Sequence, residues 1–114
     1  MNQKKHTHCQ LYLREPVFDK SCPTDDPADP YAYISDDERV KGMSFQKYVC
    51  SIDQYPNEYF DVVLIDGRAR PSCIYRGINK VSNGGLLILD NADCAYYSKG
   101  MNLLKNKRWK ENIF

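Results

Sequence analysis

The chain has 114 residues, enough for one small domain, and its 42% hydrophobic content excludes a disordered tail. A net charge of +1 at pH 7 gives no support to binding of nucleic acid or membranes through overall charge. No apolar run approaches the roughly 20 residues of a membrane span, and the polar start is no signal peptide. The five cysteines form no CxxC pair, so we expect reduced thiols in a cytoplasmic protein.

The first 43 residues carry the weakest structural signals. Residues 11–14 are predicted to form a short strand that ends before Pro16. Residues 16–38 hold most of the prolines and are rich in acid, so they are predicted to form a long loop that neither helix nor strand crosses. We expect three side chains to pin the end of this loop to the core: Tyr31, Tyr33 and Ile34.

A first helix is predicted over residues 45–52. Ser44 is a suitable N-cap, and Pro56 and Asn57 end the element. The apolar positions follow the i, i+3, i+4, i+7 spacing of a helix that faces a core: Phe45, Tyr48, Val49 and Ile52.

Residues 60–91 carry the strongest pattern in the chain. The unbroken aliphatic runs 62–65 and 86–89 are typical of parallel strands buried on both faces. Between them Pro71 suits the first turn of a helix, and residues 83–85 (Asn-Gly-Gly) are expected to end it. The helix stripe is Cys73, Ile74, Gly77, Ile78 and Val81, with Gly77 expected to pack closely on the sheet. This is the pattern of one βαβ unit.

The last part of the chain is basic. Residues 101–110 have helical character, with Leu103 and Leu104 facing inward. The basic run 105–110, which includes Trp109, is expected to be a solvated helix face, with contact to RNA as the less favoured alternative.

Oxygen-bearing side chains stand at the ends of both predicted strands. Asp66 ends the first strand, and Asp90 and Asn91 end the second. Neighbouring parallel strands lie about 4.8 Å apart, so these groups can converge, and their oxygens suit Mg²⁺ or Ca²⁺. The alternative is that the acids cap the next helix or pair with Arg68 or Arg70.

Arg68 and Arg70 flank the start of the predicted helix. A guanidinium donates two hydrogen bonds at once, so either residue could hold a carboxylate or phosphate of a substrate. Surface ion pairs with Asp66 or Asp93 explain them equally well. Tyr97 could line the mouth of a pocket or pack on the edge of the sheet.

Residues 44–97 resemble the segment around the fourth and fifth strands of class I S-adenosylmethionine-dependent methyltransferases. The resemblance lies in the run from Tyr59 to Arg70, in Cys73, in Gly84 to Asn91 and in Tyr97. It implies an α/β fold with a partial Rossmann-like parallel sheet of two to three strands and flanking helices. Residues 1–43 would add an N-terminal strand and a Pro/Asp-rich loop to a βαβ-containing core over 44–114, all in a single domain.

The resemblance also implies roles for individual residues. In the cation-dependent O-methyltransferases an acid after the fourth strand and an Asp-Asn pair after the fifth bind the metal, which makes Asp66, Asp90 and Asn91 the candidate Mg²⁺ ligands. The catalytic lysine of that family is absent; Ala69 stands near its place, which leaves Asp66, Arg68 and Arg70 as catalytic candidates and Tyr97 as the substrate contact.

The resemblance does not extend to the cofactor loop. The family binds S-adenosylmethionine with a glycine-rich loop after the first strand, but Gly42 is the only glycine before Asp66. One hypothesis is methyl transfer to a small-molecule acceptor, with the domain completed by a second copy or a complementing chain. The other is a non-catalytic domain that acts through self-association at its open sheet edges.

Overall fold

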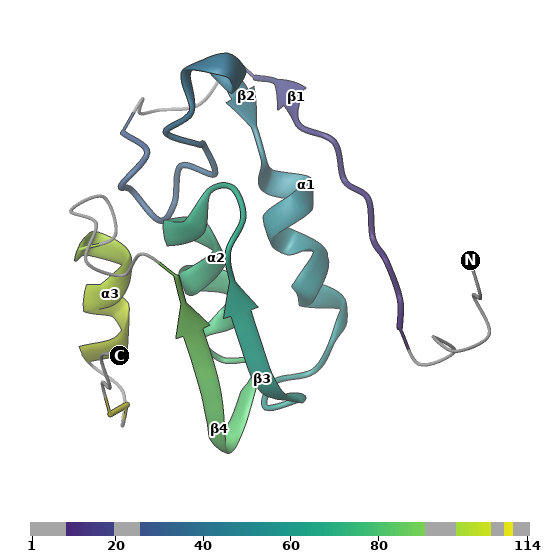
Figure 1. Ribbon diagram of the computed structural model, residues 1–114, viewed down its shortest axis with the longest axis vertical. Coiled ribbons are helices and arrows are strands. Elements are labelled where there is room, and N and C mark those ends of the chain that lie inside the picture. Colours follow the sequence, from purple (N-terminus) through teal and green to yellow (C-terminus); the bar gives the residue numbers. More distant parts are fainter. Residues whose placement is uncertain (1–8, 20–25, 91–97, 106–108, 111–114) are drawn as a thin grey trace.

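The centre of the fold is a parallel pair of strands joined by a helix (Figure 1). The computed structural model describes residues 9–19, 26–90, 98–105 and 109–110. β3 (Phe60–Ile65) leads into α2 (Arg70–Gly77), which returns the chain to β4 (Val81–Leu89), parallel to β3. The fold is therefore α/β, and the βαβ unit predicted from the sequence is confirmed.

One face of the β3–β4 sheet is covered by α2. Ile74 at the centre of α2 is fully buried, and Ile65 of β3 is buried with it. α3 (Ser98–Lys105) packs against α2 in turn, since a Cβ added at Gly100 would stand 3.0 Å from Ile74 Cδ1. α2 follows β3 after a turn of only four residues. The short connection is therefore enough to place the helix over this face of the sheet.

The opposite face of the sheet is exposed, and we call it the bare face. It is formed by Val62 and Leu64 of β3 and by their register partners Leu86 and Ile88 of β4. These four side chains are 44–60% exposed. The prediction that both strands are buried on both faces is therefore wrong, because none of the described helices covers this side.

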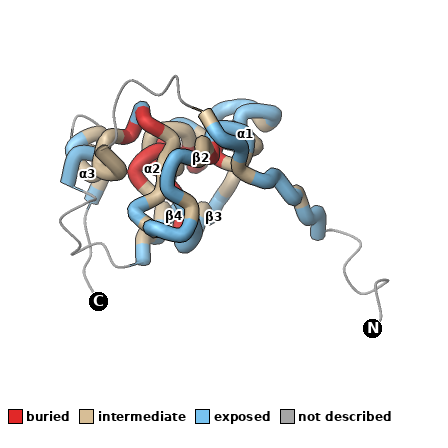
Figure 2. Tube along the Cα trace, turned by 90° about the horizontal axis from the view of Figure 1, so that it is seen from above, coloured by how far each residue is buried: buried red, intermediate tan, exposed pale blue. Residues whose placement is uncertain are grey.

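A second cluster of buried residues lies where α1 (Gln46–Val49) meets the start of α2 (Figure 2). Its members are Phe45, Val49 and Ala69, and Tyr33 packs against them from the long loop. The Tyr33 N–H also donates to Ser72 Oγ at 3.0 Å, so the expected anchoring of the loop end by Tyr33 is confirmed.

The N-terminal arm, residues 9–18, lies outside this core. The predicted strand over 11–14 is absent. Instead β1 (Val17–Phe18), which lies in the loop 16–38 predicted to hold no strand, pairs antiparallel with β2 (Met43–Ser44). The third strand expected near Leu11 therefore does not join the parallel sheet. Residues 11–14 have no neighbouring edge to bond, and an isolated extended segment gains no ladder hydrogen bonds.

The chain enters β4 earlier than expected, at Val81 rather than after the glycines. The Phe60 N–H already donates to the Lys80 carbonyl, so pairing begins as soon as α2 ends. Gly84 and Gly85 instead lie at an irregularity in the strand pairing, where the register moves from Phe60↔Val81 to Val62↔Leu86. Gly84 adopts φ +83° there.

Gly77, expected to pack closely on the sheet, has ordinary space: a Cβ there would lie 3.8 Å from Val63 Cγ1. The close approach is at Gly85, where a Cβ would lie 2.6 Å from the Asp61 carbonyl oxygen. Gly77 therefore faces Val63 of the sheet as predicted, but with room for a methyl group, and the tight contact at Gly85 was not predicted.

Two predicted helices have different limits in the structure. The first is short, with α1 continuing as the 3₁₀ helix η3 (Cys50–Gln54), and Phe45 rather than Ser44 stands at the N-cap. The Ser44 hydroxyl still accepts the Gln46 N–H at 3.2 Å. α3 begins at Ser98, before the expected residue 101, and none of the described helices has the length and apolar character needed to cross a membrane.

We expect Gly85→Ala to lower the free energy of unfolding by about 2 kcal/mol, because the new methyl group would meet the Asp61 carbonyl and the Val81 side chain. The matched control is Gly77→Ala, which should be neutral or stabilising by up to about 1 kcal/mol, since the helix has room for it. Urea unfolding of the two variants measures both effects. Equal midpoints for both would contradict the packing at Gly85.

Candidate functional site

Asp66 and Asp90 follow directly after two neighbouring parallel strands. Ile65 and Leu89 are register partners, and the Asp90 N–H donates to the Ile65 carbonyl at 3.3 Å. Both acidic residues are exposed. The structure thus brings two of the predicted site residues to one edge, where ligands of open α/β sheets bind.

Arg70 ties these two strand ends together. Nη2 donates to Asp66 Oδ1 at 3.0 Å, and Nη1 donates to the backbone carbonyl of Asp90 at 2.7 Å. Nε donates to the Gly67 carbonyl at 3.0 Å. The Arg70 side chain is 15% exposed, against 52% for Asp66. This geometry corresponds to the ion-pair alternative for Arg70, because all three donor nitrogens already serve the protein.

Arg68 points toward a different part of the chain. Its Nη1 lies 2.6 Å from Asp37 Oδ2, whereas the expected partners were Asp66 and Asp93. Asp93 lies outside the described residues. Asp37 was missed at the sequence level, because only the fold brings the acidic loop next to the end of β3.

Asp37 stands at the N-cap of η2 (Glu38–Val40), where its carboxylate accepts hydrogen bonds from several donors. Its carboxylate accepts the Arg39 guanidinium at 2.7 Å and the Arg39 backbone N–H at 2.9 Å. These bonds, and then Arg68, hold the pKa of the Asp37 carboxyl well below its ordinary value of 3.8. The group therefore stays ionised at every pH near neutrality.

The opposite directions of the two arginines follow from the backbone of Ala69. This residue is left-handed, with φ 51° and ψ 46°, and it stands at the N-cap of α2. A non-glycine residue in this region costs about 1–2 kcal/mol, and burial of the Ala69 methyl beside Phe45 and Val49 offsets part of that cost. The left-handed turn at this point directs the arginines on either side of Ala69 to different partners.

The Tyr48 side chain packs beneath this turn, next to Gly67. Tyr48 was not among the predicted site residues. A Cβ at Gly67 would collide with the Tyr48 hydroxyl, so a larger residue at this position would displace the Tyr48 ring. Burial raises the pKa of Tyr48, which keeps the phenol protonated. Burial likewise raises the pKa of Cys73 to about 12, so this thiol acts as a small hydrophobe and not as a nucleophile.

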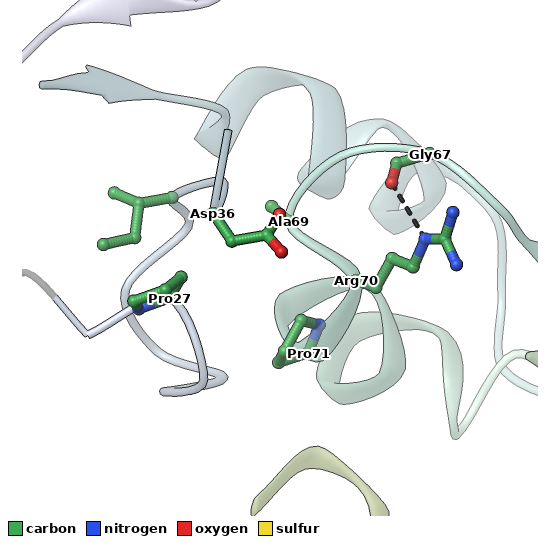
Figure 3. A pocket seen from close by; sticks show the side chains of 7 residues that line it. Pro27, Asp36, Gly67, Ala69, Arg70 and Pro71 are labelled. Atoms are coloured by element: carbon green, nitrogen blue, oxygen red, sulfur yellow. Dashed lines mark hydrogen bonds between the residues drawn. The ribbon is translucent and has the colours of Figure 1, made fainter. Parts of the chain in front are cut away.

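A small pocket opens between this turn and the long loop (Figure 3). Its cavity volume is about 20 Å³, room for about one water molecule. Ligand pockets of ordinary size are more than ten times larger, so these walls alone do not enclose a cofactor. The lining residues are Pro27, Ile34, Asp36, Gly67, Ala69, Arg70 and Pro71.

An open depression lies at the other end of the sheet, between α2 and the start of β4. Its cations are engaged by the protein itself: Arg76 Nε donates to the Tyr33 hydroxyl at 3.1 Å, and Lys80 Nζ donates to the Tyr55 carbonyl at 2.6 Å. The C-terminal end of α2 also disfavours an anion here. We therefore place the candidate site at the carboxyl ends of the strands.

The residues present at the strand ends fit a divalent cation poorly. The Arg70 guanidinium already neutralises the Asp66 carboxylate, and the described residues hold no cluster of three His, Cys, Asp or Glu side chains. Asn91 and Tyr97 lie outside the described residues, so Mg²⁺ ligation by Asp66, Asp90 and Asn91 and the substrate role of Tyr97 stay predictions.

Comparison with known proteins returned no match to a protein-family model, to a curated protein or to a solved structure. The methyltransferase interpretation therefore depends on the residues described above.

We expect Arg70→Met to destabilise the fold by about 2 kcal/mol, because the Asp66 carboxylate and two backbone carbonyls lose a charged donor. Arg68→Met is the matched control and should cost less, since it removes a single half-exposed ion pair. Urea unfolding gives both values. A larger loss for Arg68→Met would contradict the assignment of Arg70 as the residue that ties the strand ends.

The Asp37 cluster predicts a pH dependence of stability. A carboxyl whose pKa is lowered by folding stabilises the native state above its ordinary pKa and loses that contribution as the pH falls below it. The difference in urea midpoint between the wild type and Asp37→Asn should therefore be largest near pH 6 and shrink toward about pH 2.5.

Repeating this comparison in an Arg39→Ala background provides the control, because Arg39 supplies the largest share of the effect. In that background, the difference in urea midpoint that Asp37→Asn causes at neutral pH should be smaller. A difference that is independent of pH in the wild-type background would contradict the charge interaction.

Proposed function

We propose that this chain is part of a class I methyltransferase-like domain and serves S-adenosylmethionine-dependent methyl transfer to a small hydroxyl-bearing acceptor. In this proposal β3 and β4 are two neighbouring strands of a Rossmann-like sheet, and the ligands meet at the ends that carry Asp66 and Asp90. A second copy or a complementing chain would supply the remaining walls of the site.

One observation carries the proposal: the acid after β3 and the acid after β4 stand at one edge of a parallel sheet, next to the helix that joins the strands. This is the arrangement that the resemblance in residues 59–70 and 84–91 implies. Chemistry in open parallel sheets is placed at this edge, so the observation supports a ligand site there.

The described residues have different roles in this proposal. Arg70 is a positioning residue, since its bonds to Gly67, Asp66 and Asp90 hold the two strand ends in one arrangement. We assign ligand contact to the exposed carboxylates of Asp66 and Asp90. Arg68, paired with Asp37, holds the long loop beside the site. The proposal requires no metal.

A second candidate function is a non-catalytic domain that acts through association. The bare face favours it, because exposed apolar surface on a sheet marks a site of contact with another chain. The two candidates differ in whether the strand ends bind S-adenosylmethionine.

Titration of ¹⁵N-labelled protein with S-adenosylmethionine, followed by amide chemical shifts, tests the proposal directly. We expect weak binding with shifts gathered in residues 66–70 and 89–90, since the protein supplies only part of the site. Asp90→Asn should weaken binding, whereas Asp53→Asn, an equal charge change at the far end of the sheet, should not. A change in these shifts on addition of Mg²⁺ would support the predicted ligation of the metal by Asp66, Asp90 and Asn91.

An absence of shifts in those amides at millimolar ligand, in a folded sample, would contradict S-adenosylmethionine binding at this site and favour the non-catalytic alternative. Shifts confined to the Arg76 and Lys80 depression would place the ligand at the wrong end of the sheet and would count equally against the proposal.

A further inference from the structure

The molecule leaves two separate apolar surfaces exposed. One is the bare face, formed by Val62, Leu64, Leu86 and Ile88. The other is the N-terminal arm, in which Leu11 is 95% and Leu13 is 76% exposed, with Phe18 exposed at its end. Apolar surface of this extent on a small domain indicates a contact with another molecule.

The arm does not cover the bare face of its own chain. The Tyr12 hydroxyl lies 2.9 Å from the Tyr55 hydroxyl, and β1 pairs with β2, so both parts of the arm are held on the α1 side. Figure 1 shows the arm separated from β4 by α1 and β3. Leu11 and Leu13, which flank Tyr12 in the sequence, remain exposed to solvent.

The chemistry of the bare face limits what can bind it. It is aliphatic and carries no lysine or arginine, the residues that contact nucleic-acid phosphates and anionic lipids. Asp66 and Asp90 at its end repel such groups further. A partner must therefore present an apolar surface of its own.

We propose that this partner is a second copy of the chain. The two bare faces pack against each other around a two-fold axis, and the arm of each copy lies along the sheet of the other. Sheets pack face to face about 10 Å apart through interdigitated aliphatic side chains, which the four residues of the bare face provide. An isologous contact needs only one self-complementary patch.

The exposed apolar areas indicate that the arm contributes to the dimer interface. Four half-exposed aliphatic side chains offer a few hundred Å² of surface, whereas a stable interface buries about 800 Å² on each partner. The face alone is therefore too small. Leu11, Leu13 and Phe18 add exposed apolar surface of similar size, and six extended residues span about 20 Å, the length of β3.

Sedimentation equilibrium of the full chain tests the proposal. We expect the wild type to form dimers at micromolar concentration and Leu64→Glu with Ile88→Glu to dissociate them at least about 30-fold more readily. Leu11→Glu with Leu13→Glu should weaken the dimer about 10-fold. The control is Tyr31→Glu, a side chain of similar exposure beside Tyr75 of α2, which should leave the dimer intact.

A milder pair, Leu64→Thr with Ile88→Thr, keeps strand propensity if the glutamates disturb the fold, and should still weaken the dimer about 10-fold. A wild-type monomer at high micromolar concentration would overturn the proposal. So would a dimer that resists both pairs of face substitutions, because its contact would then lie elsewhere. The inference uses only the bare face and the arm, so failure of S-adenosylmethionine binding would leave it standing.

Discussion

The fold depends on the packing of α2 against one face of two parallel strands. Parallel strands place apolar side chains on both of their faces, and a crossover helix covers only the face it lies on. Here Ile65 on the covered face and Ile74 of α2 are buried, while Leu64 and Ile88 on the other side of the sheet meet solvent. The stability of the domain and its surface chemistry both follow from this asymmetry, since half of the apolar surface that defines the strands has no cover in the described chain.

The same connection determines the chemistry at the strand ends. The turn from β3 into α2 must reverse the chain within four residues, and it does so through a left-handed Ala69. The turn directs Arg70 between the two strand ends and Arg68 toward Asp37. The edge where ligands of α/β proteins bind is therefore charged, ordered by hydrogen bonds and shallow. A site of this kind can contribute one wall to a binding site, and this agrees with a domain that functions in association with another chain.

Local patterns in the sequence were sufficient to predict the central unit. The aliphatic runs, Pro71 and the two strand-end acids gave the βαβ order and placed Asp66 and Asp90 at one edge. Features that depend on distant contacts could not be predicted in this way. An aliphatic run shows that a strand avoids water, but it does not show whether a second helix is present to cover it. The Arg68–Asp37 pair, the place of the close glycine contact and the pairing of β1 with β2 all join segments that lie far apart in the sequence.

We infer that in solution the bare face of one copy is covered by the bare face of a second copy. Isotope-filtered nuclear Overhauser spectroscopy on an equal mixture of ¹³C-methyl-labelled and unlabelled chains measures this contact directly. We expect intermolecular signals to the unlabelled chain from the methyl groups of Val62, Leu64, Leu86 and Ile88. An absence of such signals at high protein concentration, with solvent contact retained at all four side chains, would contradict it.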